Sequence, residues 1–186
     1  MSKGILILDA HRSASDIMAT AVWLRRKYID VKIVMPIAGY VQYIPILSNI
    51  IRFNSSKLNI KLWPVFRKEE VHPINLLMRV LCMFYPSRMN EAERRAGNDR
   101  YLAAAKETLI NNGVVLVAPY GSPVLFGGKI KYGVRKLIET KPRIIATQST
   151  WNWEKLRYMT KAAELKDGEI AQQLEKLYRD MEQNGI

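Results

Sequence analysis

The sequence has one cysteine, Cys82, and two histidines among its 186 residues. A single cysteine excludes an internal disulfide framework. His72 has no cysteine, aspartate or second histidine at ligand spacing, and we therefore expect no metal site. The chain also lacks an apolar run of about 18–20 residues, the length that a membrane-spanning helix needs. Neither a Walker-type phosphate loop nor a GxGxxG fingerprint is present, and we expect no metal or redox cofactor.

Acidic residues are the scarcer charged class, with 17 Asp and Glu against 29 Lys and Arg, which gives a formal net charge of +12. The excess is uneven, because residues 1–150 carry +13 and residues 151–186 carry −1. A domain this basic is expected to meet nucleic acid, an anionic membrane surface or a phosphorylated substrate. No helix-turn-helix, RNP or zinc pattern accompanies the charge, so a nucleic-acid-binding domain is the weakest of these alternatives.

Short apolar runs alternate with segments of helical spacing along the chain. Strands are expected at residues 4–8, 31–35, 60–66, 114–118 and 143–147. Helices are expected at residues 13–27, 39–53 (interrupted), 92–112, 132–140 and 167–182. This alternation is typical of an α/β domain. We predict one domain over residues 1–186, a mixed sheet flanked by helices, with residues 151–186 as a C-terminal helical extension.

A histidine and an aspartate, His11 and Asp16, flank the turn between the first strand and the first helix. Five positions along one helix would turn by about 500° and separate them. They can meet if His11 lies on the loop and Asp16 in the first helical turn. A neutral histidine can then remove a hydroxyl proton, while the carboxylate fixes its tautomer. The alternative is a helix cap, with Ser13 as N-cap and Asp16 three residues later.

The strand–His–four residues–Asp–helix arrangement resembles the first motif of the glycerolipid (PlsC-like) acyltransferases. Other segments resemble later motifs of that family in the same order. These are Leu62–Arg67 for the apolar segment ending in Arg, Val117–Pro123 for the F-P-E-G-T-R-S loop, Lys131–Val134 for the Gly-containing helix start, and Lys141–Ile145 for the Pro before an apolar strand. The similarity covers residues 4–150 and implies an acyltransferase-like fold.

The resemblance implies that His11 is the general base on a hydroxyl acceptor and that Asp16 orients it. The acceptor would attack the thioester of acyl-CoA or acyl-carrier protein. Arg67 would bind the acceptor's phosphate, such as that of a lysophospholipid. The remaining substrate-binding positions would be Pro119, Gly121, Ser122 and Lys131.

Three positions depart from the family pattern: Tyr120 stands for the loop's Glu, Pro123 for its Arg, and Ala10 for the Asn before the His. The loop therefore lacks one phosphate ligand and its polar support. Lys129, Lys131 and Arg135 are candidates for substitute charge, or else form a solvated basic face. A catalytically diverged lipid-binding relative is the alternative to an enzyme.

Apolar and aromatic residues leave two further alternatives open. The segment Ile74–Tyr85 is expected either in the core or at a membrane interface, and Cys82 within it is expected as a small buried hydrophobe. Trp63, Trp151 and Trp153 are expected in the core, with a lipid boundary as the alternative. Because Asp9, His11 and Arg12 interrupt the first apolar run, it does not resemble a secretory signal. We expect a cytoplasmic protein bound peripherally to an anionic membrane, and no nucleic-acid partner.

Overall fold

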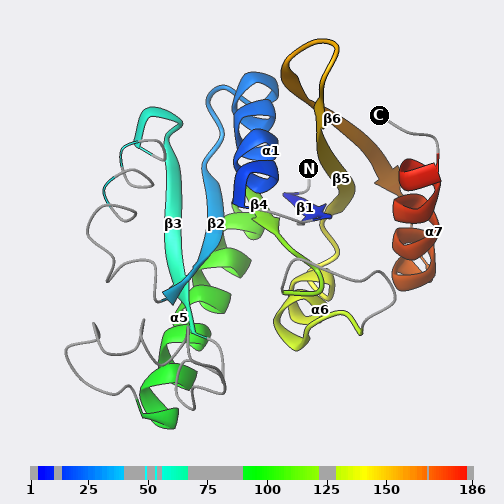
Figure 1. The fold of residues 1–186 in the computed structure, drawn as a ribbon. Helices are drawn as coiled ribbons and strands as arrows, with labels where there is room; N and C mark the ends of the chain where they lie inside the picture. The colour runs from blue at the N-terminus through cyan, green and yellow to red at the C-terminus, as the bar shows by residue number, and fades with distance from the viewer. Residues whose placement is uncertain are drawn as a thin grey trace.

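The computed structural model describes residues 4–10, 14–39, 49, 53, 56–66, 90–121, 129–166 and 168–183. Within these residues, six strands and four helices form one α/β domain (Figure 1). In chain order they are β1 (Ile5–Asp9), α1 (Ala14–Lys27), β2 (Ile33–Ala38), β3 (Ile60–Val65), α5 (Glu91–Ile110), β4 (Val114–Val117), α6 (Tyr132–Ile138), β5 (Arg143–Asn152), β6 (Arg157–Leu165) and α7 (Ile170–Gln183). The prediction of a single α/β domain with a mixed sheet is confirmed.

The strands form one sheet in the order β3-β2-β4-β1-β5-β6. All neighbours from β3 to β5 pair in parallel, and β6 pairs antiparallel to β5. Leu8 near the end of β1 pairs with Val117 on one side and Ala146 on the other. The carboxyl ends of the five parallel strands therefore meet at one edge of the sheet.

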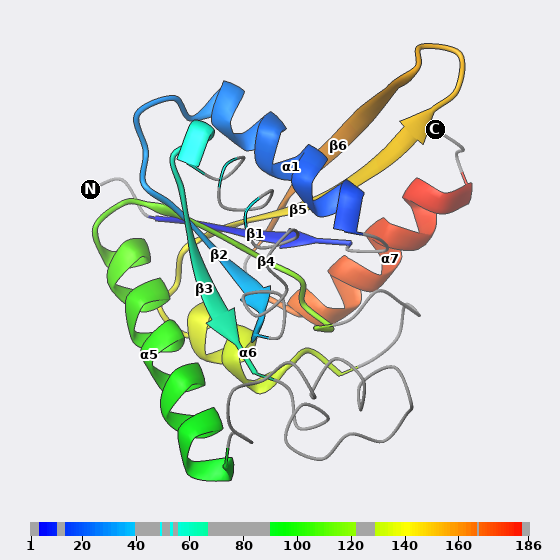
Figure 2. The same cartoon turned by 60° about the vertical axis from the view of Figure 1, so that its left-hand side comes forward.

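The two faces of the sheet are covered by different helices. Helix α1 lies over one face, and α5, α6 and α7 lie over the other (Figure 2). Side chains alternate along a strand, so Leu6 and Leu8 join the core beneath α5, α6 and α7, whereas Ile7 joins the core beneath α1. A sheet buried on both faces explains why β1 and β4 are continuous apolar runs.

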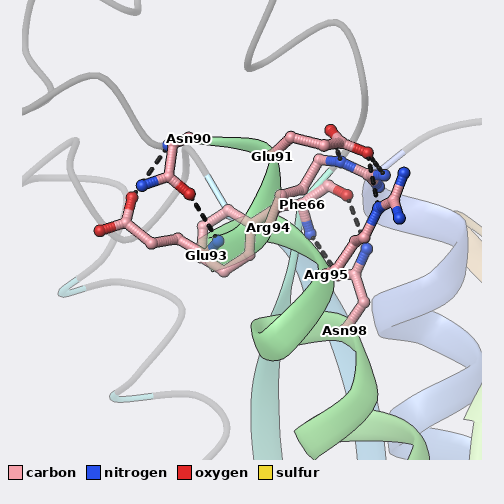
Figure 3. A network of polar contacts seen from close by, with 7 residues as sticks. All are labelled: Phe66, Asn90, Glu91, Glu93, Arg94, Arg95 and Asn98. Carbon is pink, nitrogen blue, oxygen red and sulfur yellow. Dashed lines mark hydrogen bonds and ion pairs between the residues drawn. The ribbon is translucent and has the colours of Figure 1, made fainter.

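Helix α5 packs closely on the start of β1 because Gly4 has no side chain. A Cβ at Gly4 would lie 2.1 Å from the Leu109 backbone oxygen. The same helix begins with a capping box, in which the Asn90 side chain accepts from the Glu93 amide at 2.8 Å and Glu93 accepts from the Asn90 amide at 2.9 Å (Figure 3). Capping satisfies amide groups that a helix start leaves unpaired.

The region after residue 150 differs from its prediction. Residues 151–186, expected as a helical extension, contain the end of β5 and all of β6 as well as helix α7. Strand β6 lies at the edge of the sheet and carries the sequence Lys161-Ala162-Ala163-Glu164, whose residue types favour helices. Pairing with the long strand β5 overrides this local preference. The segment Ile74–Tyr85, which contains Cys82, lies outside the described residues, and so does His72. Of the predicted helix over 39–53, only residues 39, 49 and 53 are described.

Candidate functional site at the carboxyl edge of the sheet

At the carboxyl edge of the sheet, the chain leaves two neighbouring strands toward opposite faces. From β1 the chain passes to α1 on one face, while from the adjacent β4 it passes to α6 on the other. Beyond β1, the Ala10 amide donates to the Thr147 carbonyl at 2.8 Å and holds this exit beside β5. In open α/β sheets, such a reversal opens a crevice between the two connections, where ligands bind. The candidate site lies here.

Asp16 lies in the first turn of α1 and is only 3% exposed. It belongs to the buried side of the helix, since Thr20, four residues later, and Leu24, after another four, are fully buried. Asp16 is therefore a buried residue of the first helical turn. Because His11 and Ser13 lie outside the described residues, the contact between His11 and Asp16 and the alternative helix cap with Ser13 both stay predictions.

A second buried carboxylate, which the sequence analysis did not identify, lies at the end of β1. The Asp9 side chain is fully buried and its Oδ1 accepts hydrogen bonds from the hydroxyls of Thr20 at 2.7 Å and Thr147 at 2.8 Å. Buried carboxylates are costly unless hydrogen bonds replace their hydration. An acidic residue that ends a continuous apolar strand is the sequence signal that indicates such a position.

The hydroxyls around Asp9 form a chain with one direction. Thr20 Oγ1 lies 2.7 Å from Ser149 Oγ, which lies 2.7 Å from Thr160 Oγ1. Each hydroxyl has one proton. Because Thr20 gives its proton to Asp9, Ser149 must donate to Thr20, and Thr160 must donate to Ser149. The chain ends on the carboxylate and favours its ionised form.

The loop after β4 brings together three residues predicted for substrate binding. The Gly121 amide donates to the Ala118 carbonyl at 3.2 Å and closes a turn with Pro119 at its second position. Gly121 has a φ of +75°, which favours glycine. The Lys131 amide donates to the Pro119 carbonyl at 3.0 Å, and a Cβ at Gly121 would lie 3.1 Å from Lys131 Cε. Pro119, Gly121 and Lys131 are thus neighbours, whereas Ser122 lies outside the described residues.

Tyr120 packs against the core beneath α6 and α7. Burial, and after it the negative charge of Glu175, raise the pKa of Tyr120. The Tyr178 hydroxyl of α7 donates to the Leu8 carbonyl at 2.8 Å, directly before Asp9. Burial, then the charge of Asp9, raise the pKa of Tyr178 well above its usual value. Both phenols are therefore neutral hydrogen-bonding groups at physiological pH.

The end of β3 is fixed by a side-chain amide of α5. Asn98 Oδ1 accepts from the Phe66 amide at 2.9 Å, and its Nδ2 donates to the Phe66 carbonyl at 3.0 Å (Figure 3). Gly97 permits this approach, since a Cβ there would lie 3.0 Å from the Phe66 ring. The chain direction is set one residue before Arg67, which itself lies outside the described residues.

A cavity of about 380 Å³ lies elsewhere, between α5 and strands β2 and β3. It includes none of Asp9, Asp16 or the loop 118–121, and Trp63 is on its wall. Its lining is Lys32, Val34, Lys61, Trp63, Arg100, Ala103, Ala104, Glu107 and Thr108. The candidate site is accordingly defined by the strand connections and their polar groups rather than by this cavity.

The part of the chain that the structure describes holds no group of three or more His, Cys, Asp or Glu side chains able to bind a metal ion. None of its helices is both long enough and apolar enough to cross a membrane.

No protein-family model matches the sequence, and no curated protein matches it either. The function must therefore be argued from the residues at the carboxyl edge.

Proposed function

We propose that this protein is a PlsC-like acyltransferase that transfers a fatty acyl group from a thioester to the hydroxyl of a glycerolipid-type acceptor. The observation that carries the proposal is Asp16, buried in the first turn of the helix that follows β1, beside the reversal of the connections between β1 and β4. On the facing connection are Pro119, Gly121 and Lys131, the segments that resemble the family's later motifs. A buried carboxylate on one connection and a glycine-containing loop with an exposed lysine on the other suit the activation of a phosphorylated alcohol between them.

The proposed reaction has two steps. His11 takes the proton of the acceptor hydroxyl while the oxygen attacks the thioester carbonyl, and Asp16 stabilises the resulting imidazolium. The tetrahedral intermediate then collapses, the C–S bond breaks, and the imidazolium returns its proton to the leaving thiolate. The products are an ester and a free thiol, and no metal or redox cofactor takes part.

Acceptor binding is assigned to two basic residues, of which Lys131 lies beside the loop. Lys131 is exposed, precedes α6 and adjoins Gly121. Because the loop has no arginine at Pro123, we assign the acceptor's phosphate to Lys131 and Arg67, with Ser122 and Pro119 completing the loop. An anionic headgroup near these cations would be stabilised by charge-assisted hydrogen bonds.

The test is thioester consumption with a panel of lysophospholipids and other alcohols, with the acylated product identified by mass spectrometry. We expect His11→Ala and Asp16→Asn each to lower turnover by roughly a hundredfold. His72→Ala and Asp30→Asn are the matched controls, because they change the other histidine and an exposed aspartate. Undiminished turnover in folded His11→Ala would refute the mechanism.

A catalytically diverged lipid-binding protein is the second candidate, and Tyr120 favours it. The residue at this position packs into the core instead of adding a carboxylate to the loop. A folded protein that binds vesicles but consumes no thioester with any acceptor would support this candidate. Binding to nucleic acid that weakens with salt, with no binding to anionic vesicles, would replace both candidates.

A further inference from the structure

The tip of the β5–β6 hairpin exposes large apolar side chains. Trp153 is 80% exposed, Leu156 is 71% exposed and Trp151 is 38% exposed. The prediction that both tryptophans lie in the core is wrong, because β5 extends beyond the layers that would cover them. The Trp151 ring contacts Trp153 edge-on at 6.0 Å and Tyr158 at 5.2 Å between centroids. The tip is thus an exposed aromatic cluster.

The hairpin projects from the edge of the sheet that carries the candidate site. Strand β1 ends at Asp9, which pairs with Thr147, whereas β5 continues to Asn152. Five further residues of strand advance by about 17 Å. Figure 2 shows the paired strands β5 and β6 extending past the end of β1. A flat surface that meets the tip would therefore face the carboxyl edge, about 17 Å beyond the end of β1.

Positive charge lies at the tip and further along β6, where Lys161 pairs with Gln148. Lys155, Arg157 and Lys161 are exposed and form no ion pair with any residue that the structure describes, while Glu154 is the acidic residue among them. Tryptophan concentrates where hydrocarbon meets water, and unpaired cations are attracted to anionic headgroups. The combination matches the chemistry of an anionic phospholipid surface.

Leu156 is strained as well as exposed. Its φ is +47°, in the left-handed region that favours glycine or asparagine. Within the described residues its side chain gains little burial from folding, since 71% of it stays in contact with water. Neither backbone preference nor burial within the fold favours leucine at this position, which is the pattern of a side chain that binds outside the fold.

We infer that the hairpin tip, Trp151–Arg157, inserts its aromatic and leucine side chains into the interface of an anionic phospholipid membrane. The inference rests on the proposed function in taking lipid as the partner, and it deepens that proposal by naming the surface that meets the membrane. It turns the carboxyl edge of the sheet toward the bilayer, from which a glycerolipid acceptor would come.

The experiment measures binding of the full chain to vesicles of phosphatidylcholine, alone or mixed with phosphatidylserine. We expect stronger binding to the mixed vesicles. Trp153→Ala should weaken it about tenfold, and Arg157→Gln about fivefold. Phospholipids brominated in their acyl chains should quench tryptophan emission, and the Trp151→Phe/Trp153→Phe double variant should lose this quenching.

Leu156→Gly separates a membrane role from a structural one, because the two roles predict opposite changes. Glycine relieves the backbone strain, so the midpoint of urea unfolding should stay or rise while vesicle binding falls. Ile110→Ala and Arg26→Gln are matched controls, since Ile110 is 72% exposed at the end of α5 and Arg26 is exposed on α1. Both should bind vesicles like the wild type, and Trp23→Phe should keep the quenching.

Equal vesicle binding by the tip variants and the wild type would overturn the inference. So would concentration-dependent self-association that Trp153→Ala abolishes in the absence of lipid, because the tip would then be a contact between copies of the chain. Vesicle binding that persists in His11→Ala keeps this test independent of catalysis: the proposed function fails if thioester turnover is absent, and the docking surface fails if the tip variants bind normally.

Discussion

The two faces of the central sheet bury different kinds of side chain at the carboxyl ends of the strands. Beneath α5, α6 and α7, the side chains of β1 and β4 are Leu6, Leu8, Val115 and Val117, which pack with other apolar groups. Beneath α1 the core is apolar around Ile7 and becomes polar at the carboxyl end of the strands, where Asp9, Thr20, Thr147 and Ser149 are buried together.

The difference separates what stability requires from what a site requires. Apolar packing has no direction, and many side chains of suitable volume fill such a core. A buried carboxylate stabilises the fold only if specific donors surround it, so it is a poor choice for stability alone. The polar layer beneath α1 adjoins Asp16 and the crevice, which is where a fold is expected to depart from its simplest packing.

Replacing Asp9 by leucine should give the largest effect. Asp9→Leu removes the acceptor of two buried hydroxyls, and we expect the free energy of unfolding to fall by about 3 kcal/mol. Urea unfolding followed by circular dichroism measures this change. Turnover per folded molecule should also fall, because the polar layer supports the first turn of α1.

Two matched variants show whether the stability lost in Asp9→Leu comes from the hydrogen bonds to the carboxylate. Asp9→Asn keeps an oxygen that can accept from Thr20 and Thr147, and should cost about 1 kcal/mol, because hydrogen bonds to a neutral acceptor are weaker. Leu6→Ala on the opposite face should cost about 3 kcal/mol while the folded fraction keeps its turnover. If Asp9→Leu is as stable as the wild type, the hydroxyl chain does not stabilise the fold.

The next prediction concerns Tyr178, whose hydroxyl links helix α7 to the end of strand β1. Tyr178→Phe removes the hydrogen bond to the Leu8 carbonyl and should lower the free energy of unfolding by about 1 kcal/mol near neutral pH. The hydroxyl is also a pH probe, because its pKa is raised well above 10.0, first by burial and then by Asp9. The unfolded chain releases this proton above about pH 10, while the folded protein keeps it.

The direction in which stability changes with pH follows from the number of protons that the folded and unfolded states bind. Stability contributed by the raised pKa is fully present below pH 10 and is lost as the pH rises, since the unfolded state then binds fewer protons than the folded state. The contribution of Tyr178 to the slope is about −1.4 kcal/mol per pH unit, and Tyr178→Phe should lack it. Urea unfolding at about pH 8 and about pH 11 measures the difference, and Tyr132→Phe, at an exposed tyrosine, should behave like the wild type. Equal slopes for Tyr178→Phe and the wild type would contradict the assignment.

Which faces of a strand are buried explains how much of the fold was predictable from the sequence. Continuous apolar runs marked β1 and β4 because both faces of these strands are buried. Strand β6 was missed because an edge strand has one solvated face, and residues such as Lys161 and Glu164 favour a helix locally. The alternation of strands and helices was sufficient to predict the fold class.

The candidate site was predictable only where its residues are local in the sequence. Asp16 was identified from its spacing to His11, and its burial agrees with a role at the crevice. The partners of Asp9 are 11 and 138 residues away along the chain, and pairing between distant strands cannot be inferred from one sequence. The exposure of Trp153 was missed for the same reason, since it depends on how far β5 extends beyond its neighbours.

The smallest expected effect comes from the outer end of the hydroxyl chain. Thr160→Val removes the donor to Ser149 Oγ, and because Thr160 is only half-buried, water can replace part of the lost interaction. We expect a loss of about 0.5 kcal/mol in the free energy of unfolding, against about 2 kcal/mol for Thr20→Val, which removes the hydroxyl that donates directly to Asp9.

A double-mutant cycle of Thr160→Val and Thr20→Val decides whether the hydroxyls act as one polarised chain. A coupling energy of about 0.5 kcal/mol between these residues, which do not bond to each other, would indicate that Ser149 transmits the effect. Strict additivity would instead mean that each hydrogen bond stabilises the layer independently, and that the polarity of the α1 face is a set of local contacts centred on Asp9.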